Sequence, residues 1–133
     1  MATYNKFQSW VEYLAEGVNC GTDQFVVALS NTLPVNTNAT LSQITEISYT
    51  NLSSRNLTTA SSSQSGGTFS LDFNDLVLTA SGSVGPFRYV VIYDDTVTGD
   101  PLVAWFDYGS SITMANGDTF TLTFNASGLF TVT

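Results

Sequence analysis

The sequence predicts a mainly β fold, an antiparallel, jelly-roll-like β-sandwich with one N-terminal α-helix. Three observations predict it: apolar residues alternate with Thr and Ser over most of the chain, turn residues recur about every 8–12 positions, and only one segment has helical spacing. A parallel sheet would need a crossover helix after each strand. The 133 residues suffice for a single domain, expected over 1–133 with the helix at about 4–17 and the sandwich at about 24–133. The pattern leaves immunoglobulin and jelly-roll topologies open.

The predicted helix depends on one apolar stripe near the N-terminus. Its members are spaced i, i+3, i+4, i+7, i+8 and i+11, and they are Phe7, Trp10, Val11, Leu14, Ala15 and Val18. Thr3 is suited to cap the start, and Gly17 or Gly21 to end the helix in a left-handed conformation. We expect the stripe to pack on the domain's own sheet, with a neighbouring subunit as the alternative.

The segment between the helix and residue 67 has mixed signals. Residues 25–29 form a continuous apolar run, which suits a strand covered on both faces. Residues 31–38, which contain Pro34, are a predicted loop. Residues 41–47 form either a short helical turn or an irregular strand. Residues 48–67 are rich in Ser, Thr, Asn and Gly, which indicates either a pair of exposed edge strands or a long mobile loop.

From residue 68 onward the pattern is that of short antiparallel strands. Apolar residues recur every second position, as they do in a strand with one buried and one solvated face. The predicted strands lie near 69–73, 76–78, 87–93, 102–108, 120–124 and 129–132. Asn116 and Gly117 predict a β-hairpin that joins residues 112–114 to the strand at Phe120.

Composition excludes several classes of function. The chain has 3 basic and 11 acidic residues, a net charge of −8, which argues against nucleic-acid and anionic-membrane partners. It has no His, so His-based acid–base catalysis and His metal sites are excluded. The single Cys20 cannot form an intrachain disulfide or a thiolate metal site. We therefore expect no enzyme activity, no catalytic or metal residues and no cofactor.

Neither a targeting segment nor a membrane span is expected. Polar residues such as Gln8, Glu12 and Glu16 interrupt the first twenty positions, and no apolar run approaches the roughly 18 residues of a transmembrane helix. The sequence therefore predicts a protein that is made and kept in the cytosol or released by lysis.

The carboxylates that gather at one turn form the first local candidate. Asp94, Asp95 and Asp100 lie close together, with Asp107 one strand later, and oxygen ligands on a turn are what Ca²⁺ requires. Their spacing does not match an EF-hand loop, so we favour an acidic surface turn that faces solvent.

Other polar and aromatic side chains lie within predicted strands. Arg88 lies in an apolar strand, where a lone charge is costly, so we expect it to pair with a carboxylate or carbonyls of its own chain rather than across a subunit boundary. Tyr89, Tyr93, Trp105 and Tyr108 could form a sugar-binding platform. Tyr89 and Tyr93 lie on the same strand face as Val91, and Trp105 on the same face as Val103, so we favour a place in the core for these aromatic residues.

Several motifs together resemble a family of small structural proteins from the virions of tailed bacteriophages. The resemblance is carried by MATYNKF at 1–7, GPFRY at 85–89, DPL at 100–102 and DYGSS at 107–111. It spans nearly the whole chain, and its motifs are turns and strand ends. It implies a virion component and supplies no catalytic residues.

The resemblance and the charge together predict a capsid decoration or cement protein. An acidic chain is a poor lining for packaged DNA, so the head exterior is favoured, with the host cytoplasm as the location during assembly. The expected partners are the major capsid protein and copies of the chain itself, as a dimer or trimer, because few charges protect its strand edges. Alternatives are a tail-tube or tail-completion subunit, or a carbohydrate-binding module using Trp105 and Tyr108.

The contact surface of such a protein should be uncharged at its centre, since buried unpaired charges are costly. Three segments fit: residues 50–67, with Arg55 as their only charge, residues 2–7, which are mostly polar and expected to be free to reach a neighbour, and the turn at 82–88. The individual candidates for interaction are Tyr4, Phe7, Arg55, Ser61, Ser65, Pro86 and Arg88.

Overall fold

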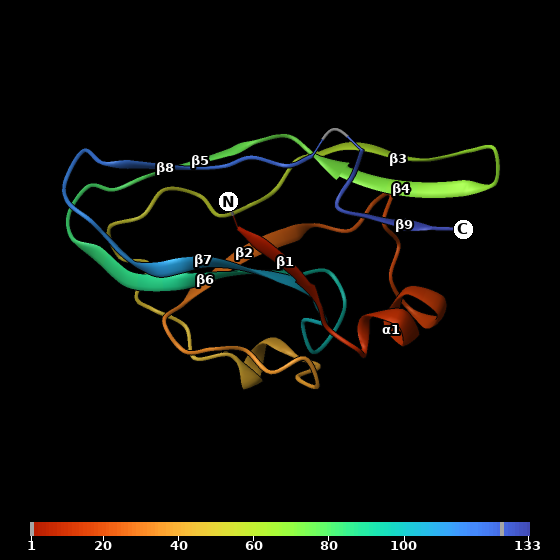
Figure 1. Ribbon diagram of the computed structural model, residues 1–133, viewed down its shortest axis with the longest axis horizontal. Coiled ribbons are helices and arrows are strands. Elements are labelled where there is room, and N and C mark those ends of the chain that lie inside the picture. Colours follow the sequence, from red (N-terminus) through yellow and green to blue (C-terminus); the bar gives the residue numbers. More distant parts are fainter. Residues whose placement is uncertain (1, 126) are drawn as a thin grey trace.

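A computed structural model describes residues 2–125 and 127–133, and Met1 and Ala126 of the predicted domain lie outside the described residues. Antiparallel sheets form two stacked layers, and one helix, α1 (Trp10–Glu16), lies at one end (Figure 1). The mainly β fold with a single α-helix is thus confirmed over the described residues, whereas the jelly-roll connectivity stays a prediction. Within these ranges, no helix has the length and apolar character needed to cross a membrane.

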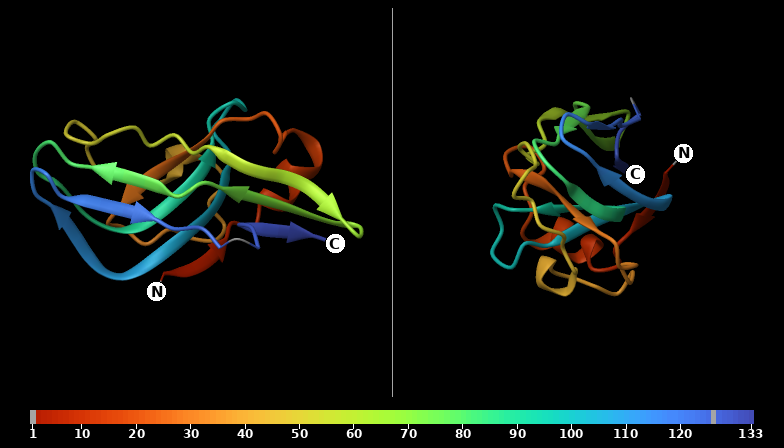
Figure 2. Two further views of the ribbon diagram at one scale, coloured as in Figure 1. Left: turned by 90° about the horizontal axis from the view of Figure 1, so that it is seen from above. Right: turned by 90° about the vertical axis from the view of Figure 1, so that its left-hand side faces the viewer.

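The lower layer is a four-stranded sheet and the upper layer is built from two smaller sheets. The lower sheet has the order β1 (Thr3–Lys6), β7 (Leu102–Met114), β6 (Val84–Asp94) and β2 (Phe25–Ser30). One upper sheet has the order β3 (Thr59–Ser65), β4 (Thr68–Phe73) and β9 (Phe130–Val132). The other pairs β5 (Leu76–Thr79) with β8 (Thr119–Leu122). Figure 2 shows the two layers from above and from one end.

Both faces of the lower sheet are buried. Its upper face packs into the main core with side chains such as Val27, and its lower face forms a second cluster with side chains such as Val26. The 3₁₀ helix η1 (Leu41–Gln43) and the chain around Ile44 help to cover that lower face. All six residues of β2 are buried, which confirms the strand covered on both faces.

The aromatic residues proposed as a sugar platform lie largely in the lower cluster. The solvent-exposed fractions of Tyr89, Tyr93 and Trp105 are 7%, 5% and 8%. The core interpretation of these three is therefore confirmed, and Tyr108 is half-buried against the main core.

The N-terminus differs from the predicted helix over 4–17. Residues 3–6 form β1, which pairs with β7 in register Thr3↔Asp107, and the helix begins only after Ser9. The reason is that Phe7 packs in the lower cluster and Trp10 in the main core, whereas a helix would place both on one face. Gly17 does end the helix, at φ −150° rather than in a left-handed conformation.

The Asn116–Gly117 signal gives a turn but not the predicted hairpin. Asp118 N donates to Ala115 O at 3.0 Å, and Gly117 has φ +89°. The strand after the turn, β8, pairs with β5 instead of β7. After Met114 the turn carries the chain into the other layer, where the Phe120 ring of β8 packs edge-on against Phe87 of β6 at 5.3 Å between centroids.

Residues 48–67 are held by hydrogen bonds rather than forming a long mobile loop. Val27 N donates to Arg55 O at 2.9 Å, and Ser53 N donates to Thr79 O at 3.1 Å, so this stretch is tied to both layers. Within the same stretch, β3 is an exposed strand at the edge of the upper layer. The edge-strand alternative therefore holds for residues 59–65.

Candidate interaction surface

The predicted contact residues of the N-terminal segment have different environments. Tyr4 is 38% exposed on β1, and its ring lies edge-on to that of Phe106 at 5.6 Å between centroids. Phe7 is fully buried, with its ring 5.0 Å from that of Trp105. The expectation that residues 2–7 are free to reach a neighbour is therefore wrong for residues 3–7, because residues 3–6 pair with β7 and Phe7 is buried.

Arg55 is bound within its own chain. Its Nη1 donates to Val27 O, and its guanidinium lies 3.7 Å above the centre of the Tyr49 ring. The Tyr49 hydroxyl donates to Glu46 Oε1 at 2.7 Å and accepts from Leu29 N at 3.0 Å. Burial is the main cause that raises the pKa of Tyr49. Arg55 thus closes a polar network at the sheet edge and is a poor candidate for a partner contact.

The remaining predicted contact residues do not gather in one place. Ser61 and Ser65 are exposed on β3, whereas the exposed Pro86 lies near the start of β6, towards the other end of the molecule (Figure 1). Arg88 forms a two-pronged ion pair with Asp107, at 2.8 and 3.1 Å, which confirms the intrachain partner. The structure therefore brings no single surface together from these residues.

The prediction that the acidic turn faces solvent is wrong for Asp94, which is fully buried. Its Oδ1 accepts from Thr96 N at 2.9 Å and from Val97 N at 3.4 Å. Burial, and next the neighbouring Asp23, raise the pKa of Asp94 to about 7. Among residues 2–125 and 127–133, no group of three His, Cys, Asp or Glu side chains could hold a metal ion.

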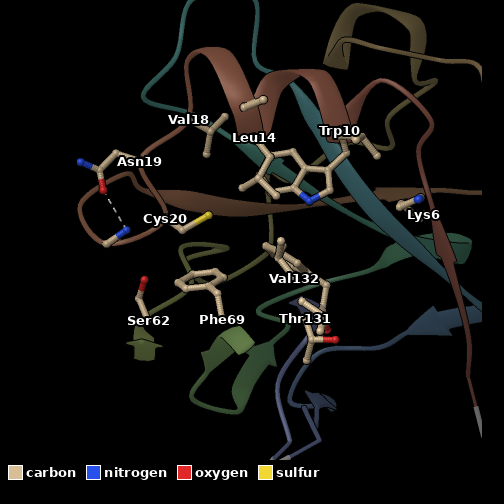
Figure 3. A pocket seen from close by; sticks show the side chains of 15 residues that line it. Lys6, Trp10, Leu14, Val18, Asn19, Cys20, Ser62, Phe69, Thr131 and Val132 are labelled. Atoms are coloured by element: carbon tan, nitrogen blue, oxygen red, sulfur yellow. Dashed lines mark hydrogen bonds between the residues drawn. The ribbon is translucent and has the colours of Figure 1, made fainter. Parts of the chain in front are cut away.

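A large apolar groove lies between α1 and the upper layer. Its volume is about 1000 Å³, at the upper end of the range for ligand pockets, about 300–1,000 Å³. We call it the α1 groove (Figure 3). Its apolar lining comes from α1 and the loop after it, β4 and β9: Trp10, Val11, Leu14, Ala15, Val18, Cys20, Phe69, Phe130 and Val132.

Few polar groups line the α1 groove. The indole of Trp10 is 1% exposed, and its Nε1 has no hydrogen-bond partner among the described residues. In Figure 3 this nitrogen points toward the side chains of Thr131 and Val132 across the groove. Burial is the main cause that raises the pKa of Cys20 to about 11. The groove therefore offers mainly apolar walls and, besides polar side chains such as Lys6 and Asn19, one buried hydrogen-bond donor without a partner among the described residues.

Lys6 is the single charged residue of the lining. The other two cations of the chain, Arg55 and Arg88, are engaged by Val27 O and by Asp107. An occupant of the groove therefore meets almost no charge.

The sequence indicated both walls of the groove but not the groove itself. Trp10, Leu14 and Val18 were expected to pack on the domain's own sheet, and Phe69 and Phe130 to lie in strands. The missing information is that α1, β4 and β9 meet around an open groove, because a local pattern does not show how distant segments pack. Comparison with known proteins finds no match among protein families, curated proteins or solved structures.

Proposed function

We propose that the protein is a non-enzymatic structural component of a tailed-bacteriophage virion, a decoration protein on the outside of the capsid. The observation that carries the proposal is the α1 groove, a formed apolar recess open to solvent in a free subunit. Exposed apolar surface of this kind is typical of proteins completed by assembly. The phage-like motifs and the net charge of −8 support an external position, away from packaged DNA.

The capsid-facing contact in this proposal is the free edge of β3. Ser61 and Ser63 lie on the outward side of the strand, with their hydroxyls 3.2 Å apart, and Ser65 follows at the same parity. This edge bears no charge, and an unpaired strand edge can accept another strand by main-chain hydrogen bonding. The partners are the major capsid protein through β3 and further copies of the chain through other surfaces.

Trp105 is 8% exposed and cannot serve as a stacking platform, which disfavours the carbohydrate-binding alternative. The tail-tube or tail-completion alternative differs from decoration in location, and the experiment below separates the two.

Cryo-electron microscopy of virions tests the proposal directly. We expect density that fits this chain on the outer surface of the head, and heads lacking the protein should lose their DNA at a lower temperature. Density in the tail instead would establish the alternative, and absence from purified virions would overturn both.

A rebinding assay tests the capsid-facing edge. Added to heads that lack the protein, a Ser61→Asp/Ser65→Asp variant should bind with lower occupancy than wild type, since charges on an edge oppose strand addition. The matched control is Thr119→Asp/Thr121→Asp on β8, also exposed strand positions. Equal loss of occupancy in both variants would contradict the β3 contact.

A further inference from the structure

A second apolar feature is exposed on the loop that follows β2. Leu33 and Val35 are 60% and 54% exposed, while Pro34 between them is buried. We call residues 31–38 the apolar loop. It follows the lower side of the lower sheet, away from β3, β4 and β9 (Figure 1).

The apolar loop is held in a fixed conformation by hydrogen bonds. Val35 N donates to Asn38 Oδ1 at 2.9 Å, and Asn38 N donates to Val35 O at 2.8 Å. Gln8 N donates to Asn36 O at 2.8 Å, which ties the loop to the chain just before α1. The two exposed side chains are thus presented with little conformational entropy left to lose on binding, which favours affinity.

The apolar loop and the α1 groove have matching chemistry. No charged residue occurs from 24 to 45, so the loop brings no charge into an apolar recess. The loop also presents backbone carbonyl oxygens, such as that of Leu33, and these are acceptors of the kind that the buried Nε1 of Trp10 lacks. A groove of about 1000 Å³ has room for more than a single side chain.

We propose that the α1 groove binds the apolar loop of a second copy of this chain, with Leu33 and Val35 inserted between α1 and β9. This deepens the proposed function, on which it rests, by naming the surface that joins neighbouring decoration subunits. Because the contact joins two different surfaces, it can repeat from copy to copy and close as a ring.

Charged substitutions on either surface should abolish self-association. We expect the purified wild-type chain to associate in sedimentation equilibrium. Leu33→Glu in the loop and Val11→Glu in the groove wall should each raise the dissociation constant about thirtyfold or more. Val11 is 57% exposed, so neither change disturbs the core. The control Val77→Glu, at a 52% exposed position on β5, adds the same charge and should associate like wild type.

Mixing the two variants identifies the pairing of surfaces. The Leu33→Glu chain keeps its groove and the Val11→Glu chain keeps its loop, so an equimolar mixture should form a heterodimer although neither variant associates alone. Restoration on mixing supports the proposal, and failure to restore overturns it. A wild-type chain that stays monomeric up to about 1 mM also overturns it.

A second pair of variants on the same two surfaces shows whether the loss of association arises from the contact or from misfolding. Val35→Glu and Val132→Glu change the same two surfaces at 54% and 43% exposed positions. Circular dichroism and thermal unfolding should match wild type for every variant. These experiments are made in solution without capsids. A negative result would therefore overturn self-association without bearing on the virion location, and absence from virions would not bear on self-association in solution.

Discussion

The guanidinium of Arg88 binds both carboxylate oxygens of Asp107 across β6 and β7, with Nε–Oδ1 at 2.8 Å and Nη2–Oδ2 at 3.1 Å. Gly109 N adds a third hydrogen bond to Asp107 Oδ1 at 2.8 Å. The Arg88 contact, followed by the Gly109 hydrogen bond, lowers the pKa of Asp107. Arg88, the one cation of β6, thus lies next to a fixed partner.

This pair makes a pH-dependent contribution to stability. Because the pKa of Asp107 is lower in the folded state, the contribution is present above the unfolded value of about 3.9 and is lost as the pH falls through the folded value. Asp107→Asn should therefore lower the urea midpoint at pH 7 and have less effect at pH 2. A double-mutant cycle with Arg88→Gln measures the coupling energy between the two side chains. A destabilisation by Asp107→Asn that is the same at pH 7 and pH 2 would contradict the expectation.

The buried carboxyl of Asp94 should have the opposite pH dependence. Its folded pKa of about 7 lies above the unfolded value of about 3.9, so the folded state binds more protons between the two, and stability falls as the pH rises through that window. Asp94→Asn removes the cost of the buried charge. It should raise the free energy of unfolding at pH 8 by on the order of 1 kcal/mol and change little at pH 4.

Denaturant titrations of the Asp94 variant at several pH values check this expectation. The exposed neighbour Asp95 provides the control, since Asp95→Asn removes the same charge from the same turn. A destabilised Asp94→Asn protein at pH 8 would show that the ionised carboxylate is needed.

Gly85 should tolerate no side chain. It has φ +109°, and a Cβ placed there would lie 2.7 Å from the backbone oxygen of Ile112. Gly85→Ala should cost about 2 kcal/mol or more, from both the conformation and the clash. Gly109 has φ +85° but open space around it, so Gly109→Ala should cost only about 1 kcal/mol. Equal costs in thermal or urea unfolding would contradict the close approach.

Phe7 should behave as a core residue and not as a contact residue. Its ring is fully buried against Trp105, so Phe7→Ala should cost about 3–5 kcal/mol. Tyr4→Ala, three positions earlier on the exposed side of β1, should cost about 1 kcal/mol or less. Urea unfolding followed by tryptophan fluorescence distinguishes the two, and a Phe7→Ala protein as stable as Tyr4→Ala would restore the idea of a free N-terminal arm.

Local patterns predicted much of the strand content. Residues 25–29 could be assigned as a strand buried on both faces because the run lacks polar residues, and the alternation at 69–73 because a strand turns its side chains to opposite faces. The parity of Tyr89 and Tyr93 with Val91 placed them in the core for the same reason. These features depend only on neighbours along the chain.

The sequence by itself thus determined the mainly β class, the single helix and the exclusion of His chemistry, and it favoured an intrachain partner for Arg88 without identifying it. Only the tertiary structure decided that residues 3–6 join β7, that β8 pairs with β5, that Asp94 is buried and that α1, β4 and β9 together line a groove. The physical reason is that strand pairing and burial are decided by partners distant in the sequence. A helical stripe such as Trp10, Leu14 and Val18 indicates which side of the helix is apolar, but not how closely another element covers that side.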